Sequence, residues 1–169
     1  MSASAPAPDG VPLPQRYWAI LTIGLGLTLA VLNTAIANVA LPAIARDLDI
    51  TPATSIWVVN AFQLAVTVSL LPLASLGEIY GYRRVYKAGL ILFTVASLFC
   101  AISTSLPVLI VARVAQGIGA AGLMSVNGAL VRFIYPRAWL GRGVGLNATI
   151  GSVASAIGPS VASAILSVA

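Results

Sequence analysis

Arg113 is a charged residue deep within a long apolar run, residues 106–133. A cation in bilayer hydrocarbon costs at least about 2.5 kcal/mol and usually faces a cavity or a polar partner. At 1.5 Å per residue, Arg113 lies about 10 Å along a helix that begins at Leu106. The alternative is an arginine that snorkels to the membrane surface, for which this depth is awkward. We therefore expect Arg113 to have a functional role.

Two amides are candidates to share a polar site with Arg113. Gln116 lies one turn further along the same helical face. Asn33 lies about 12 Å from the far end of the first apolar run, so it can face Arg113 at a similar depth. The alternative is that amides only hold helices together, each contributing about 1 kcal/mol or less. We prefer that alternative for Asn60, Gln63 and Asn127.

Small residues follow one predicted helical stripe between residues 143 and 168. They are Asn147, Gly151, Ser155, Gly158 and Ala162. Such a stripe lets another backbone approach closely. Pro159 removes a helical hydrogen bond and favours a kink.

A short polar connector follows the second apolar run. It pairs the acid Glu78 with Gly81 and with the cations Arg83 and Arg84. The tendency of cytoplasmic connectors to collect cations explains the arginines. It does not explain the spacing of the acid, the glycine and the arginine pair.

Several kinds of chemistry are not expected. The sequence has no histidine, and Cys100 is its single cysteine, so we expect neither a metal site nor a disulfide. The apolar runs contain no acid pair and no cluster of metal ligands, so we expect no enzyme, no catalytic residues and no cofactor. The net charge of +5 is spread over short connectors, so we expect no nucleic-acid partner.

The elements that would hold these residues are membrane-spanning helices. The sequence is 59% hydrophobic and 8% charged, and its mean hydropathy is +1.00. Apolar runs of about 20 residues cross the hydrocarbon of a bilayer. We predict an all-α, polytopic bundle with five spans, at residues 17–41, 55–76, 85–103, 106–133 and 143–168. Thr51 and Pro52 predict a helix start, and STSLP at 103–107 predicts an antiparallel hairpin.

The distribution of cations predicts the orientation of the bundle. Seven Lys and Arg residues lie on one side of the five spans and only Arg46 lies on the other. Cytoplasmic connectors collect these residues, so the amino terminus is predicted to be cytoplasmic. Residues 1–16 are rich in proline and are predicted to be a flexible cytoplasmic tail. Five spans leave the carboxyl terminus outside at the end of an apolar helix, so we expect a fragment or a subunit that assembles with copies of itself.

Four segments resemble motifs of the major facilitator superfamily, in the expected order. ASLGEIYGYRRVY is similar to the family's loop between helices two and three, with Gly81, Arg83 and Arg84 matching and Glu78 in place of aspartate. LIVARVAQGIGAA is similar to the helix-four motif, and GSVASAIGPSVAS to the antiporter motif of helix five. LNTAIANVALP resembles helix one of the fourteen-helix drug:proton antiporters, with Asn33 in the place of an acid.

The resemblance implies a function and roles for the residues. It implies secondary active transport in a bacterial inner membrane, with efflux of amphipathic or cationic drugs in exchange for protons. It assigns proton coupling to Arg113, Gln116 and the position of Asn33, a latch to the Glu78 connector, and a kink to Gly158 and Pro159. An amide, however, does not bind and release a proton near neutral pH. The alternative is a membrane fragment that needs the rest of a transporter, or another copy, before it transports anything.

Overall fold

The computed structural model describes residues 10–166 of the chain. Within this range the chain forms five long α-helices and one short 3-10 helix. They are α1 (Leu13–Asp47), α2 (Pro52–Tyr80), α3 (Tyr82–Ala101), α4 (Leu106–Ile134), η1 (Arg137–Trp139) and α5 (Leu140–Leu166). All five α-helices are long and apolar enough to span a membrane. The predicted fold class, an all-α bundle of five spans, is confirmed.

The helices extend beyond most of the predicted apolar spans, and the largest differences are at the two ends of α1, which continues to Asp47 although its span was predicted to end at Leu41. This helix begins at Leu13, whereas the span was predicted to begin at Tyr17 and residues 1–16 to form a tail. Proline was interpreted as a sign of unstructured chain, but it is tolerated in the first helical turn, where its missing N–H needs no partner. The rest of the predicted tail, residues 1–9, lies outside the described residues.

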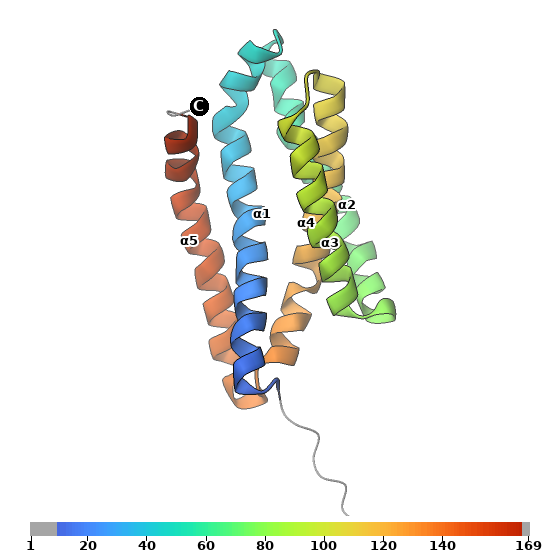
Figure 1. The fold of residues 1–169 in the computed structure, drawn as a ribbon, viewed down its shortest axis with the longest axis vertical. Helices are drawn as coiled ribbons and strands as arrows, with labels where there is room; N and C mark the ends of the chain where they lie inside the picture. The colour runs from blue at the N-terminus through green and yellow to red at the C-terminus, as the bar shows by residue number, and fades with distance from the viewer. Residues whose placement is uncertain (1–9, 167–169) are drawn as a thin grey trace, which may run out of the picture.

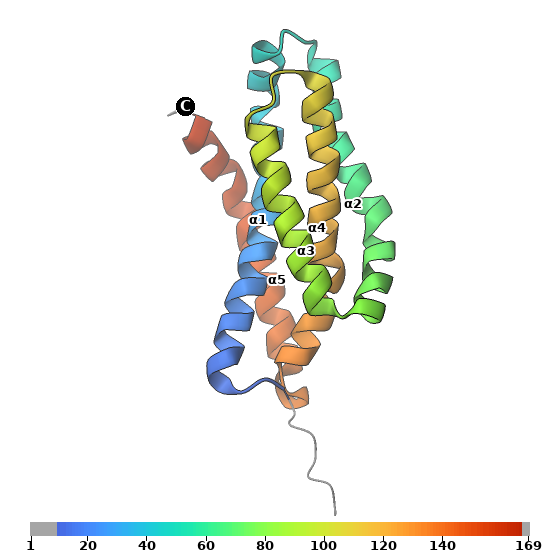
Figure 2. The same ribbon diagram turned by 45° about the vertical axis from the view of Figure 1, so that its right-hand side comes forward.

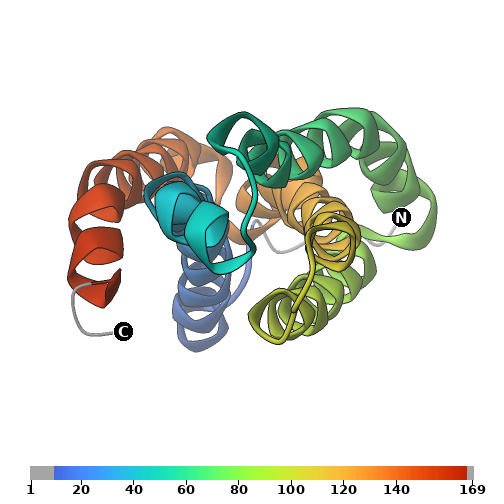
Figure 3. The same cartoon turned by 90° about the horizontal axis from the view of Figure 1, so that it is seen from above.

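The helices form two groups that lie side by side (Figure 1). The helix α4 packs against α2 and α3, and α1 packs mainly against α5. Seen from above, α1 and α5 lie on one side and the other three helices on the other side (Figure 3). The short turn at 102–105 joins α3 and α4 into the predicted antiparallel hairpin (Figure 2).

The core of the bundle surrounds α4. In the most apolar window of α4, 56% of the residues are buried, compared with 17–22% in the other helices. Large apolar side chains on the outside remain exposed, including Val68, Leu71 and Leu98. In water this exposure would be unfavourable, but in hydrocarbon these side chains contact lipid. The described part of the chain is therefore built for a lipid environment.

Two helix ends show why the chain changes direction where it does. The hydroxyl of Thr51 accepts a hydrogen bond of 3.2 Å from the backbone N–H of Thr54, and Pro52 is the first residue of α2, as predicted. Between α2 and α3, Gly81 has a φ of +93°. A residue with a side chain rarely adopts this conformation, so Gly81 allows α3 to begin immediately after α2 ends.

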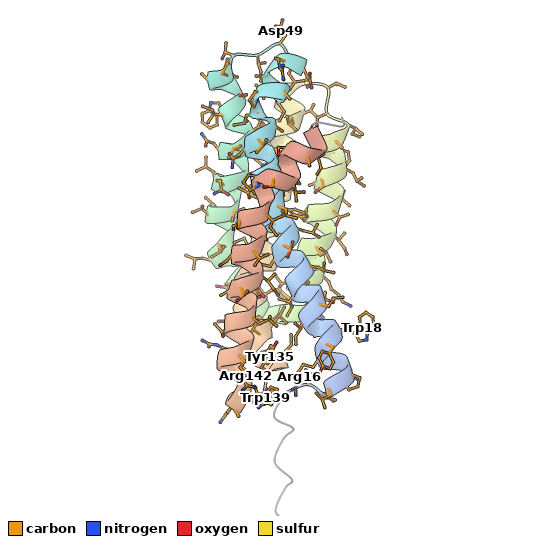
Figure 4. The ribbon with its side chains drawn as sticks, turned by 90° about the vertical axis from the view of Figure 1, so that its left-hand side faces the viewer. Arg16, Trp18, Asp49, Tyr135, Trp139 and Arg142 are labelled. Carbon is orange, nitrogen blue, oxygen red and sulfur yellow. The ribbon has the colours of Figure 1, made fainter. Side chains whose placement is uncertain are left out.

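The two ends of the bundle differ in charge. Arg16 and Arg142 lie together at one end, with the rings of Trp139 and Tyr135 nearby, and Asp49 lies at the opposite end (Figure 4). The guanidinium of Arg142 stacks 5.1 Å from the ring centre of Trp139. Aromatic rings and cations are typical of the region where a membrane helix meets water.

Candidate functional site

The guanidinium of Arg113 is buried where three helices meet, with 4% of the residue exposed. Its Nε donates a hydrogen bond of 3.1 Å to the carbonyl of Val58 on α2. Its Nη1 donates to Asn33 Oδ1 on α1 at 3.3 Å and to Gln116 Oε1 at 2.6 Å. The ring of Phe62 lies 4.7 Å from the centre of the guanidinium, a cation–π distance. Arg113 therefore does not snorkel to the surface.

Gln116 connects Arg113 to α3. The Nε2 of Gln116 donates to Asn33 Oδ1 at 3.1 Å and to the hydroxyl of Ser97 at 2.7 Å. The thiol of Cys100 lies 3.9 Å from Gln116 Oε1. We call Asn33, Ser97, Arg113 and Gln116 the Arg113 cluster. It joins side chains from α1, α3 and α4, and its arginine also binds the backbone of α2.

Small residues on α4 explain how the neighbouring helices come close enough to form the Arg113 cluster. A Cβ atom at Gly117 would lie 2.6 Å from the carbonyl oxygen of Phe62 on α2. One at Gly119 would lie 2.5 Å from the backbone nitrogen of Phe93 on α3. Such distances are too short for real carbon atoms, so these glycines permit backbone contact. Gly117 thus lets α2, with Phe62, approach Arg113. Gly119 lets α3, with Ser97, approach Gln116.

One cleft is lined by residues of the Arg113 cluster, and a second is lined by Phe62, whose ring stacks on Arg113. The first, which we call the Asn33 cleft, has a volume of about 400 Å³ and is lined by Asn33 and Arg113, with Asp47 and Ser103 at the loop end. The second, the Ser155 cleft, has a volume of about 510 Å³. Its lining includes Thr34, Asn38, Gln63, Ser155 and Pro159. The second cleft therefore lies between α1, α2, α4 and α5, and is partly polar.

The predicted stripe on α5 divides between two surfaces. Gly151 and Gly158 face α1, since a Cβ atom at Gly158 would lie 2.6 Å from the Cβ of Ala35. Ser155 was predicted to belong to the same stripe, but it is exposed in the Ser155 cleft together with Pro159. Ala154 is buried in its place. The spacing of small residues did not show which of two neighbouring positions faces α1.

The residues of the predicted latch lie at the end of the bundle where α2 joins α3. Glu78, Arg83 and Arg84 are exposed, and within residues 10–166 none of them forms an ion pair. Glu78 lines a cleft of about 540 Å³ together with Arg132 of α4. The latch stays a prediction, because the described residues give Glu78 no bonded partner.

The sequence placed the three central residues of the cluster but missed others. Asn33, Arg113 and Gln116 were predicted to share a site, and they are hydrogen-bonded to one another. Ser97 was missed, and Cys100, which lies beside Gln116, was not predicted to belong to the site. Both lie on the face of α3 that carries Phe93 and Ala96, which are buried. This helical spacing was the available signal.

The architecture is that of a membrane transporter: several spanning helices enclose a polar, buried site, which lies nearer the end of the bundle where α4 begins. Comparison with known proteins supports this interpretation and identifies the family. The sequence profile of the Major Facilitator Superfamily matches residues 23–169. The chain belongs to this superfamily, as its motifs predicted.

Several transporters are similar to this chain. It is 62% identical to the uncharacterized transporter YebQ of Escherichia coli over 95% of the chain and 35% of the relative. It is 31% identical to the riboflavin transporter RibZ of Clostridioides difficile, over 91% of the chain and 34% of the relative. It is 37% identical to the multidrug resistance protein Stp of Mycobacterium tuberculosis, over 84% of the chain and 27% of the relative. The chain therefore spans about a third of the length of these relatives.

Proposed function

We propose that this chain contributes to proton-driven export of amphipathic or cationic compounds from the bacterial cytoplasm. The observation that carries the proposal is the Arg113 cluster, which lines one cleft large enough for a small molecule and contacts, through the ring of Phe62, the lining of a second. In a complete transporter of this superfamily, such a site lies between the two halves of the bundle and is exposed to each side in turn.

The substrate class rests on the motifs and on the names of the relatives. Multidrug resistance protein Stp supports a drug-like substrate. The riboflavin transporter RibZ is about as similar to the chain, so vitamin-like substrates are a second candidate. The polar part of the Ser155 cleft, with Asn38 and Gln63, offers hydrogen bonds to either kind of compound.

Three groups of residues have proposed roles in transport. Arg113, Gln116 and Asn33 act at the coupling site. The close approach at Gly151 and Gly158, and the helix-interior Pro159, allow α5 to change direction during the transport cycle. Glu78, Gly81, Arg83 and Arg84 act as a latch at the cytoplasmic end, with the amino terminus on that side of the inner membrane.

The test is efflux of a fluorescent cation from everted membrane vesicles that contain the protein from the full reading frame. Arg113→Ala is expected to abolish efflux, and Arg46→Ala, at an exposed arginine outside the cluster, to preserve it. If Arg113→Ala reaches the membrane and transports like the parent, its proposed role is wrong. Expression of residues 1–169 alone tests the alternative, a fragment that transports only when the rest of the protein or another copy is present.

A second variant tests the coupling role of position 33. Asn33→Asp introduces a group that can bind and release a proton next to Arg113. We expect the pH dependence of efflux to differ between this variant and the parent. An unchanged pH profile in Asn33→Asp would remove the basis for coupling at this position.

A further inference from the structure

The hydrogen-bond donors of the Arg113 cluster outnumber its acceptors. A guanidinium carries five N–H groups. In Arg113 the Nε and Nη1 groups have acceptors, but the Nη2 nitrogen has none within the described residues. The Nδ2 nitrogen of Asn33 is also buried and has no acceptor there. Two adjacent side chains therefore carry buried donors that are not satisfied.

The orientation of the Asn33 amide follows from its neighbours. Its Oδ1 accepts hydrogen bonds from Arg113 Nη1 and from Gln116 Nε2. Turning the amide over would direct its NH2 group at both of these donors and lose two hydrogen bonds. The unsatisfied Nδ2 is therefore a consequence of the cluster, and a flipped assignment does not remove it.

The positive charge of Arg113 has no compensating acid in the described part of the chain. Asp47 lines the far, loop end of the Asn33 cleft, but it lies fourteen residues after Asn33 on α1, which corresponds to about 21 Å along the helix axis. Glu78 lies twenty residues after Val58 on α2, or about 30 Å. Asp49 lies beyond the end of α1. All direct partners of the guanidinium are neutral, and burying a charge without a counter-charge is costly.

We propose that the Arg113 cluster binds a monovalent anion, either a halide or a carboxylate, which enters through the Asn33 cleft. Both residues with unsatisfied donors line this cleft, whose volume of about 400 Å³ is ample for such an ion. A bound anion accepts hydrogen bonds from Nη2 and Nδ2 and neutralises the guanidinium. A cation is repelled by the same groups, and a water molecule satisfies the donors without supplying the charge.

The anion takes the electrostatic place that a carboxylate at position 33 would occupy. Asparagine at this position keeps the size of aspartate but leaves the charge to be supplied from outside. The carboxylate can be a free ion or part of a transported compound. The proposal rests on the proposed function only in placing the site on a transport pathway, because anion binding itself is measured without transport.

The experiment compares three proteins from the full reading frame, purified in detergent: the parent, Asn33→Asp and Asn38→Asp. The melting temperature of each is measured over the same concentration series of sodium chloride and, separately, of sodium acetate. Asn38 is an exposed asparagine on the same helix, which lines the other cleft, so its variant carries the same added charge away from Arg113. Matched salt concentrations make the ionic-strength effect common to all three proteins.

For a protein about three times the length of this chain, we expect the melting temperature of the parent and of Asn38→Asp to rise by about 1–2 °C for each tenfold rise in a binding anion above its Kd, beyond the response of Asn33→Asp. In Asn33→Asp the new carboxylate replaces the anion, so its melting temperature is already high at low salt. A response to chloride identifies a halide site, and a response to acetate alone identifies a carboxylate site. Equal responses in all three proteins would overturn the proposal.

Equilibrium dialysis of the parent protein with radioactive chloride and acetate gives a second measurement that needs no variant to fold. We expect saturable binding of at least one probe, and a failure to bind either in the millimolar range contradicts the proposal. Efflux by a protein that binds no anion would refute only this inference. Anion binding without efflux would refute only the proposed function.

Discussion

The hydroxyl of Tyr86 on α3 donates a hydrogen bond of 2.7 Å to the backbone carbonyl of Thr22 on α1. This contact links the group formed by α1 and α5 to the group formed by α2, α3 and α4. Tyr86 is buried, and its hydroxyl fills the space beside Gly26, where a side chain would collide with it. The absence of a side chain at Gly26 is therefore what lets Tyr86 reach α1.

Gly26→Ala should separate α3 from this part of α1. The added methyl group displaces the Tyr86 hydroxyl, so the cost includes the lost hydrogen bond of about 1 kcal/mol and the strain of repacking. In a Tyr86→Phe background the same substitution should cost less, because the hydroxyl is already absent. Unfolding of the four proteins in detergent measures this coupling. Additive effects would show that the two residues do not act together.

Glycines on α4 differ in what surrounds them, which allows a matched pair of substitutions. A Cβ atom at Gly119 would lie 2.5–2.9 Å from backbone atoms of Phe93 and Gly89, which cannot rotate away. Gly119→Ala should therefore destabilise the bundle by about 2 kcal/mol or more. A Cβ atom at Gly128 has nothing within 4 Å, so Gly128→Ala should be neutral or gain up to about 1 kcal/mol of helix propensity.

Unfolding by denaturant in detergent compares the two glycine variants directly. Similar stabilities for Gly119→Ala and Gly128→Ala would mean that α3 and α4 do not touch at Gly119. The efflux that Gly119→Ala retains shows whether transport depends on the contact between α3 and α4. If the helix pair separates, Ser97 moves away from Gln116 and the Arg113 cluster loses its contact with α3.

The depth of each residue in the bundle could be predicted from the sequence, but its direction could not. Asn33 and Arg113 were placed at similar depths because the rise of a helix per residue is constant. The rotation of each helix about its axis depends on packing, which a single sequence specifies only through its pattern of small and large residues. That is why Ser97 was missed and why Ser155 was assigned to the same stripe as Gly151 and Gly158.

Ser97 holds the side chain of Gln116 in place, and its loss should destabilise the protein more than the removal of one small hydroxyl group usually does. Its hydroxyl accepts a hydrogen bond of 2.7 Å from Gln116 Nε2 and donates one of 2.7 Å to the carbonyl of Phe93. Ser97→Ala leaves a buried amide N–H without this acceptor, at a cost of about 1–3 kcal/mol. Thr94→Ala is the control, since Thr94 makes the same kind of backbone bond on an exposed face. Equal melting temperatures for the two variants would exclude the supporting role.

Gly81 should be the residue of the α2–α3 connector least tolerant of substitution. Its φ of +93° and ψ of +131° are accessible to glycine, whereas nothing within 4 Å would obstruct a methyl group. Gly81→Ala should therefore cost about 1–3 kcal/mol through backbone strain alone.

Gly141 is the matched control, because it is exposed, helical and equally unobstructed. If the connector acts as a latch, Gly81→Ala should also slow efflux, since relief of the strain moves Arg83 and Arg84 relative to Glu78. If Gly81→Ala loses the expected stability but transports as fast as Gly141→Ala, the strain at Gly81 affects stability and does not affect transport. The connector would then serve to join α2 to α3 and would have no part in the transport cycle.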